Sequence, residues 1–144
     1  MGYLDAIDEA KATTRMPLRV RFCETDLMGI VHHSRYFLYF EAGRVEWLRK
    51  RGVTYAEWAA KGVHLPVVDT QATYKTPARF DDLLTIETTL TKLGTVSIAF
   101  AYRVLRDDTL VATGATRLGC VDETHKLARM PEHMRAVLLG GEVS

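Results

Sequence analysis

The sequence predicts a single α+β domain in which one curved antiparallel sheet wraps around a long central helix. A segment from about Ser34 to Arg51 has helical periodicity and is apolar nearly all round in its first turns, as expected for a helix enclosed by other elements. Strand-like alternation precedes this segment and continues through residues 63–121, interrupted only by short turns. One sheet surrounding one helix satisfies this order of elements.

Length and charge are those of one ordinary globular domain. The 144 residues suffice for a core that buries about two-thirds of the unfolded surface. A net charge of +1 provides no field that could hold a polyanion, so we expect no nucleic-acid partner. Together with this charge, the 47% hydrophobic content is that of an ordinary soluble protein, so we expect no membrane span. The first residues lack a basic region followed by an apolar run, so we expect no signal peptide and a cytoplasmic location.

The polar residues 1–15 fit either a frayed tail or a short helix, and we place the domain at residues 16–144. Leu18, Val20 and Phe22 then alternate with other residues, which predicts a half-buried strand from Leu18 to Cys23.

The two cysteines, Cys23 and Cys120, both lie in apolar strand patterns, so we expect buried free thiols. No second Cys or His lies at metal-ligand spacing from either of them. We therefore predict no metal and no cofactor.

A turn containing Asp26 and Gly29 separates the first strand from the long helix. The first turn of a helix has N–H groups without intrahelical acceptors, and with the helix dipole they attract anions. An ester or thioester carbonyl placed there would have its developing oxyanion stabilised, while Asp26 could act as a nucleophile or as a general base for water. The structural alternative is an Asx-turn role for Asp26, since Asp close to Gly suits loops.

Two features of the long helix carry expectations about packing. Gly43 costs about 1 kcal/mol relative to Ala in a helix interior, so we expect a strand to approach closely there. Glu41 and Arg44, three residues apart, can form a shielded ion pair, which we favour over a catalytic role because an unpaired buried charge is costly. Gly52 ends the helix.

The second half of the chain is mainly strands. A short helix, Thr54–Ala60, is predicted first, with Glu57 at the capping-box position. Pro66 indicates a bend or an edge position near the start of the next strand, and Pro131 opens a terminal helix that ends at Gly140 and Gly141. Between them we expect an antiparallel meander of four strands: Val63–Thr76, Asp82–Leu93, residues 96–104 and Leu110–Val121.

The segment that begins at Thr25 reads T-D-L-M-G-I-V-H-H-S-R-Y-F-L-Y-F-E-A-G-R. It resembles the signature of the 4-hydroxybenzoyl-CoA thioesterase branch of the hotdog-fold superfamily, which includes the short-chain acyl-CoA thioesterases associated with the Tol-Pal system. The resemblance rests on the T-D pair, the following glycine and apolar pair, two aromatic residues three apart and the F-E-A-G-R run. It implies a hotdog fold and hydrolysis of an acyl-CoA thioester.

Transferred to this sequence, the resemblance places the catalytic carboxylate on Asp26 and the oxyanion-binding backbone amide on His33. Many family members have Tyr-His where this chain has His32-His33, so His32 replaces an aromatic residue of the acyl pocket. The side chains of both histidines are candidates for protonating the leaving thiolate, the alternative being helix-start residues exposed by the turn. The residues expected to bind substrate are Gly29, Ile30, Val31, His32, Ser34 and Tyr36.

The phosphates of CoA require basic residues at the mouth of the site. Candidates, each with a solvated surface charge as the alternative, are Lys75, Arg79, Arg103, Arg117, Lys126 and Arg129.

One curved sheet leaves long open edges, which a two-fold contact between copies would cover. In the family that the sequence resembles, the active site lies at such a seam. The resemblance therefore implies a homo-oligomer, either a dimer or a tetramer.

Three functions are compatible with the predicted fold. We favour a thioesterase acting on a small aromatic or short-to-medium-chain acyl-CoA. A non-catalytic acyl-CoA-binding or regulatory hotdog domain is the alternative, and the Asp in the turn argues against it. A hotdog dehydratase would carry its catalytic His and acid elsewhere, and the long helix shows no such arrangement.

Overall fold

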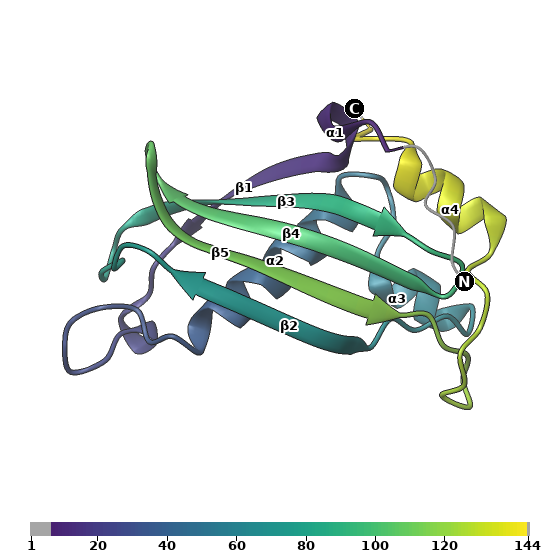
Figure 1. The fold of residues 1–144 in the computed structure, drawn as a ribbon, viewed down its shortest axis with the longest axis horizontal. Helices are drawn as coiled ribbons and strands as arrows, with labels where there is room; N and C mark the ends of the chain where they lie inside the picture. The colour runs from purple at the N-terminus through teal and green to yellow at the C-terminus, as the bar shows by residue number, and fades with distance from the viewer. Residues whose placement is uncertain (1–6, 144) are drawn as a thin grey trace.

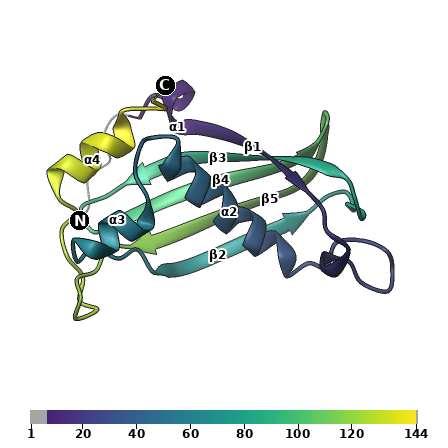
Figure 2. The same ribbon diagram turned by 180° about the vertical axis from the view of Figure 1, so that it is seen from behind.

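The computed structural model describes residues 7–143 and has the predicted α+β architecture. A five-stranded antiparallel sheet curves past the long helix α2, which lies across one face (Figure 1, and from behind in Figure 2). In chain order the elements are α1 (Glu9–Ala12), β1 (Thr13–Arg19), the 3-10 helix η1 (Phe22–Glu24), α2 (Arg35–Arg49), α3 (Tyr55–Ala60), β2 (Val67–Tyr74), β3 (Leu83–Leu93), β4 (Ser97–Arg106), β5 (Thr109–Gly119) and α4 (Glu132–Leu139).

The strand order is β1-β3-β4-β5-β2, with all pairs antiparallel. Successive hairpins join β3, β4 and β5, as predicted, but the four-stranded meander is wrong for β2, which pairs with β5 and not with β3. The chain enters the sheet from α3 on the side of β5, and residues 75–82 then carry it back to β3 (Figure 2). The edge position indicated by Pro66 is confirmed, because β2 is an edge strand with a register shift between Val67 and Asp69.

The first strand lies earlier than predicted. β1 pairs with β3 from Thr13 to Arg19, so its first three residues, Thr13–Arg15, were wrongly expected to belong to the tail. Phe22 and Cys23 are exposed instead of continuing the strand, because the Arg21 N–H donates to the Glu24 carboxylate and turns the chain into η1. Cys120 is buried as predicted. Residues 1–6 of the predicted tail lie outside the described residues.

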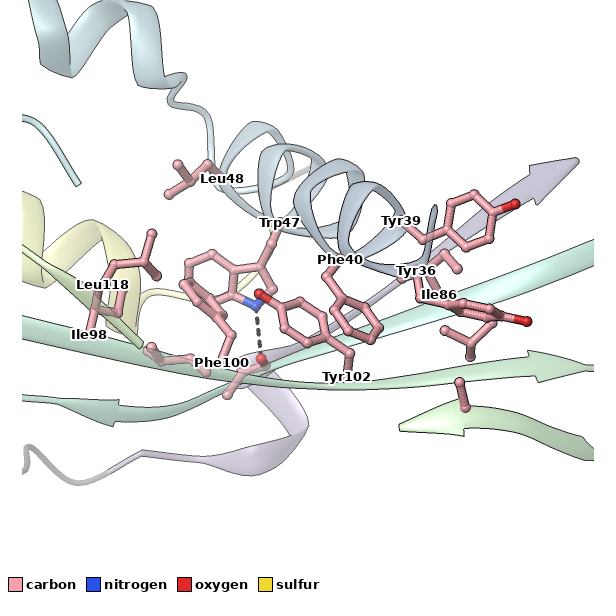
Figure 3. Close-up of a cluster of buried hydrophobic side chains, with 14 of the residues drawn as sticks. Tyr36, Tyr39, Phe40, Trp47, Leu48, Ile86, Ile98, Phe100, Tyr102 and Leu118 are labelled. Carbon is pink, nitrogen blue, oxygen red and sulfur yellow. Dashed lines mark hydrogen bonds between the residues drawn. The ribbon is translucent and has the colours of Figure 1, made fainter. Parts of the chain in front are cut away.

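The core forms between the apolar face of α2 and the sheet (Figure 3). Phe40 stacks on Tyr102 with ring centroids 4.5 Å apart, and Trp47 meets the edge of Phe100 at 5.1 Å. The Trp47 Nε1–H also donates to the Ala12 carbonyl at 2.8 Å, which ties the end of α1 to the helix. These contacts fix α2 in both position and rotation.

The close strand approach expected at Gly43 is confirmed. A Cβ at this position would lie 2.4 Å from Thr88 Oγ1 and 3.0 Å from Ile86 Cγ2, both on β3. The absence of a side chain therefore lets α2 lie close to the sheet.

The prediction of an ion pair between Glu41 and Arg44 is wrong. Arg44 faces the sheet and is only 7% exposed, and its guanidinium donates to Tyr102 Oη at 3.1 Å and Thr116 Oγ1 at 3.5 Å. Glu41 is exposed instead. With 3.6 residues per turn, residues three apart are about 60° apart around the axis, so Arg44 can face the sheet while Glu41 faces solvent.

The helix boundaries follow the predicted signals closely. Gly52, with φ at +83°, follows the end of α2. The Thr54 side chain accepts a hydrogen bond of 3.1 Å from the Glu57 N–H and caps α3. The terminal helix α4 begins directly after Pro131 and stops before Gly140.

Candidate active site

The loop between η1 and α2 folds back on itself as a small hairpin. Asp26 N–H donates to the Ile30 carbonyl at 2.9 Å, and Gly29 N–H donates to the Asp26 carbonyl at 2.9 Å. Gly29 has φ at +77°, a conformation that costs a glycine little. The turn that the sequence predicted is therefore tightly closed.

Neighbouring segments hold this hairpin on both sides. His32 N–H donates to the Glu24 carbonyl at 2.9 Å, and Val31 N–H donates to the Ala78 carbonyl at 2.8 Å. Ile30 also forms a β-bridge with Arg79. The connection from β2 to β3 thus holds the loop in place beside the first turn of α2.

The Asx-turn role considered for Asp26 is confirmed, and it leaves part of the carboxylate open. Its Oδ1 accepts a hydrogen bond of 2.8 Å from the Met28 N–H, which is an Asx-turn contact. Its Oδ2 accepts no hydrogen bond from any residue in the range 7–143, and the partly buried side chain lines a cavity. The turn therefore orients the carboxylate and leaves one oxygen available.

The cavity has a volume of about 290 Å³ and lies where the hairpin, the start of α2 and the end of β2 meet. Its walls are mainly apolar and aromatic, with a carboxylate and an ammonium group among them. The lining residues are Asp26, Met28, Ile30, Val31, His33, Tyr36, Tyr74, Lys75, Thr76 and Pro77.

The His33 N–H is free for a ligand. The Arg35 N–H donates to the His32 carbonyl at 2.9 Å, and the Ser34 N–H donates to His32 Nδ1 at 3.2 Å. By contrast, the His33 N–H donates to no acceptor within the described part of the chain. It lies one residue before Ser34, the N-cap of α2, where the helix dipole favours negative charge.

The family model described as the thioesterase-like superfamily matches residues 20–138, which include this loop, α2 and strands β2 to β5. The chain belongs to this superfamily. With its sheet and helix arranged as described, it is a hotdog-fold thioesterase.

Similar proteins agree with this assignment. The acyl-CoA thioesterase YbgC of Haemophilus influenzae is 34% identical over 107 residues, which cover 74% of this chain and 79% of the relative. The crystal structure of a hypothetical protein from Thermus thermophilus has a TM-score of 0.84 and 38% identity, covering 92% of this chain and 99% of the other. A DHNA-CoA thioesterase from Staphylococcus aureus has a TM-score of 0.78 and 28% identity, covering 81% of this chain and 80% of the other.

The structure of the thioesterase separates the residues that the sequence singled out into two groups. Asp26, Ile30, Val31, His33 and Tyr36 line the cavity together. Gly29, His32 and Ser34 do not line the cavity. They shape the loop instead, because Gly29 occupies the turn and His32 Nδ1 lies 2.8 Å from Ser34 Oγ.

Tyr36 and Tyr74 form an aromatic corner of the cavity, with ring centroids 5.3 Å apart. Burial, followed by the influence of Tyr74, raises the pKa of Tyr36 to about 12, so its phenol is protonated at neutral pH. The Tyr74 hydroxyl donates to the His33 carbonyl at 3.0 Å. Sequence reasoning missed Tyr74 because no local signal relates the end of β2 to a loop 41 residues earlier.

The basic residues considered for CoA phosphates also divide. Lys75 lines the cavity, and Arg79 Nη1 lies 3.7 Å from the position that a Cβ on Gly29 would take. Arg103 and Arg117 form ion pairs with Glu87 and Asp69 on the strands. Lys126 and Arg129 are exposed on the segment after β5.

Two negative observations apply to the described residues. Between Ile7 and Val143, the thioesterase has no group of three or more His, Cys, Asp or Glu side chains placed to hold a metal ion. Over the same range, no helix is both long enough and apolar enough to cross a bilayer.

Proposed function

We propose that this protein hydrolyses an acyl-CoA to a free carboxylic acid and CoA. The observation that carries the proposal is that two residues line one cavity: Asp26, whose carboxylate has one open oxygen, and His33, whose N–H is unengaged and lies just before α2. Relatives named as acyl-CoA thioesterases support the same reaction.

In the proposed reaction, the thioester oxygen accepts a hydrogen bond from the His33 N–H. As a nucleophile adds to the acyl carbon, the negative charge that develops on this oxygen is stabilised by the N–H and by the helix dipole. Asp26 acts in one of two ways. It attacks the carbon itself and forms an anhydride that water hydrolyses, or it removes a proton from a water that attacks.

Collapse of the tetrahedral intermediate breaks the carbon–sulfur bond and releases the CoA thiolate, which takes up a proton. We assign this proton to the His33 imidazole, because His33 lines the cavity while His32 Nδ1 contacts Ser34. The products are the acid and the CoA thiol.

The proposed substrates are small aromatic or short-to-medium-chain acyl-CoA esters. A cavity of about 290 Å³ bounded by Tyr36 and Tyr74 accommodates an acyl group of this size, and aromatic walls pack favourably on a planar ring. Lys75 on the wall and Arg79 beside the turn are the cations that we assign to the CoA phosphates.

We also propose that the protein is cytoplasmic and forms a homo-oligomer in which copies associate through the free edge of β2. This strand pairs with β5 on one side, and no described strand pairs with its other side. Val67, Val68 and Tyr74 on it are 48%, 54% and 46% exposed. A two-fold contact along this edge would join two sheets and bring the partner copy next to the cavity at Tyr74, in a dimer or within a tetramer.

The deciding experiment measures thiol release from a panel of benzoyl-, acetyl-, hexanoyl- and palmitoyl-CoA. We expect turnover by the wild type and a loss of at least about a hundredfold in Asp26→Asn with an unchanged circular dichroism spectrum. Asp122→Asn is the matched control, because Asp122 Oδ1 makes the same type of turn contact, at 2.8 Å to the Thr124 N–H, away from the cavity.

The alternative is a non-catalytic acyl-CoA-binding domain. Binding of the panel without thiol release would favour this alternative. An Asp26→Asn variant as active as wild type would remove Asp26 from the mechanism.

A further inference from the structure

We propose that Tyr74 is a positioning residue of this thioesterase. Its hydroxyl holds the peptide group that follows the His33 amide and thereby fixes the direction in which the His33 N–H points. The inference rests on the proposed function, because that function gives the His33 N–H its oxyanion-binding role.

Tyr74 reaches the loop of Asp26 and His33 from the end of β2, and it lines the same cavity. It is the last residue of β2, and its hydroxyl donates to the His33 carbonyl at 3.0 Å. Its ring meets His33 edge-on, with centroids 6.4 Å apart at 74°, and meets Tyr36 at 5.3 Å and 62°. Tyr74 therefore contacts the backbone and the ring of the residue that carries the free N–H.

The backbone transmits this contact to the N–H. The His33 N–H belongs to the peptide group between His32 and His33, whose carbonyl accepts from the Arg35 N–H at 2.9 Å. The next peptide group has its carbonyl held by Tyr74 and its N–H held by His32 Nδ1. Peptide groups are planar, so fixing the planes on both sides of His33 leaves its two dihedral angles little freedom.

An oxyanion donor acts only when it is directed at the position that the charged oxygen takes. Without the Tyr74 hydroxyl, the peptide group between His33 and Ser34 loses one of its two holding contacts and can rotate. The ring of Tyr74 would still form its part of the cavity wall. We therefore expect a defect in the chemical step with little change in substrate binding.

The position of Tyr74 on β2 gives this contact a second consequence. β2 is the edge strand assigned to the proposed contact between copies, and its other hydrogen-bonded side belongs to β5. The direction of the His33 N–H therefore depends on the placement of an element that is remote from the loop in sequence.

The test compares Tyr74→Phe, which removes the hydroxyl and keeps the ring, with Thr70→Val. Thr70 lies on the same strand, and its hydroxyl donates to the Ala115 carbonyl at 3.2 Å, outside the cavity. The chain has five histidines, so labelling with 15N-histidine gives a simple amide spectrum. We expect the His33 amide signal to move in Tyr74→Phe only, with kcat reduced about tenfold and KM within about twofold of wild type.

An unmoved His33 signal in Tyr74→Phe overturns the proposal, whatever the activity. An equal loss of kcat in Thr70→Val, or a rise in KM alone, also overturns it, because these results indicate a loosened strand or a lost substrate contact. A wild type that releases no thiol defeats the proposed function, and a moved His33 signal in that case still supports the backbone contact.

Discussion

The phenol of Tyr39 on α2 donates a hydrogen bond of 3.1 Å to Oε1 of the buried carboxylate of Glu24, the last residue of η1. The same carboxylate accepts from the Arg21 N–H at 2.8 Å. Burial, followed by the charge of Glu24, raises the pKa of Tyr39 well above its usual value, so the phenol stays a donor. One side chain therefore joins the segment before Asp26 to the helix whose first turn faces the cavity.

Glu24→Ala should destabilise the protein by about 1–3 kcal/mol, because it leaves the buried Tyr39 hydroxyl without an acceptor. Tyr39→Phe should cost less, about 0.5–1.5 kcal/mol, because the carboxylate keeps its contacts with Arg21. Urea unfolding followed by circular dichroism measures both. Equal stability of Glu24→Ala and wild type would contradict the importance assigned to this carboxylate.

Gly114→Ala should destabilise the fold by about 1–3 kcal/mol through overpacking. A Cβ there would lie 2.3 Å from two ring atoms of Phe40 and 2.9 Å from the Gln71 carbonyl oxygen. Gly119→Ala, on the same strand, is the control, because its Cβ would lie 3.5 Å from Val68 Cγ2, an ordinary contact distance. Thermal unfolding compares the two, and equal midpoints would show that Phe40 can move away at little cost.

The ionisation of Tyr36 predicts a pH dependence of stability. Its pKa is raised from 10.0 to about 12 in the folded protein, mainly by burial, so the folded state holds this proton more tightly than the unfolded state. The corresponding stability is present below pH 10 and is lost as the pH rises toward 12. Between about pH 9 and pH 11, the free energy of unfolding should therefore decrease less in Tyr36→Phe than in the wild type. An identical decrease in the free energy of unfolding of both proteins would contradict this prediction.

The open edge of β2 predicts the behaviour of a surface variant. Val68 is 54% exposed on this strand, so Val68→Lys should weaken the proposed contact by placing a charge in it. Light scattering should give a wild-type mass that is a multiple of 16.2 kDa and a shift toward the single chain in the variant. Val143→Lys is the control, because Val143 is 60% exposed and its N–H donates to the Lys50 carbonyl at the end of α2. A monomeric wild type would refute the assembly directly.

Much of the fold was predictable because its signals are local. The periodicity of residues 35–49, the Thr54 cap and the turn at Gly29 each depend on interactions between residues close in the chain. Predictions failed where a longer-range contact competed with the pattern. Phe22 and Cys23 continue a strand by alternation alone, yet the Glu24 carboxylate turns the chain away. Arg44 lies three residues from Glu41 but contacts hydroxyls of β4 and β5.

The sequence by itself determined the sheet-and-helix class, the turn that presents Asp26 and the helix start at which His33 stands, because neighbouring residues encode all three. Only the tertiary structure decided that β2 lies beside β5, that Tyr74 meets the His33 carbonyl and that Lys75 joins the same cavity. These relationships follow from the order in which distant strands pair. That order is selected by the packing of the whole core, which no local pattern records.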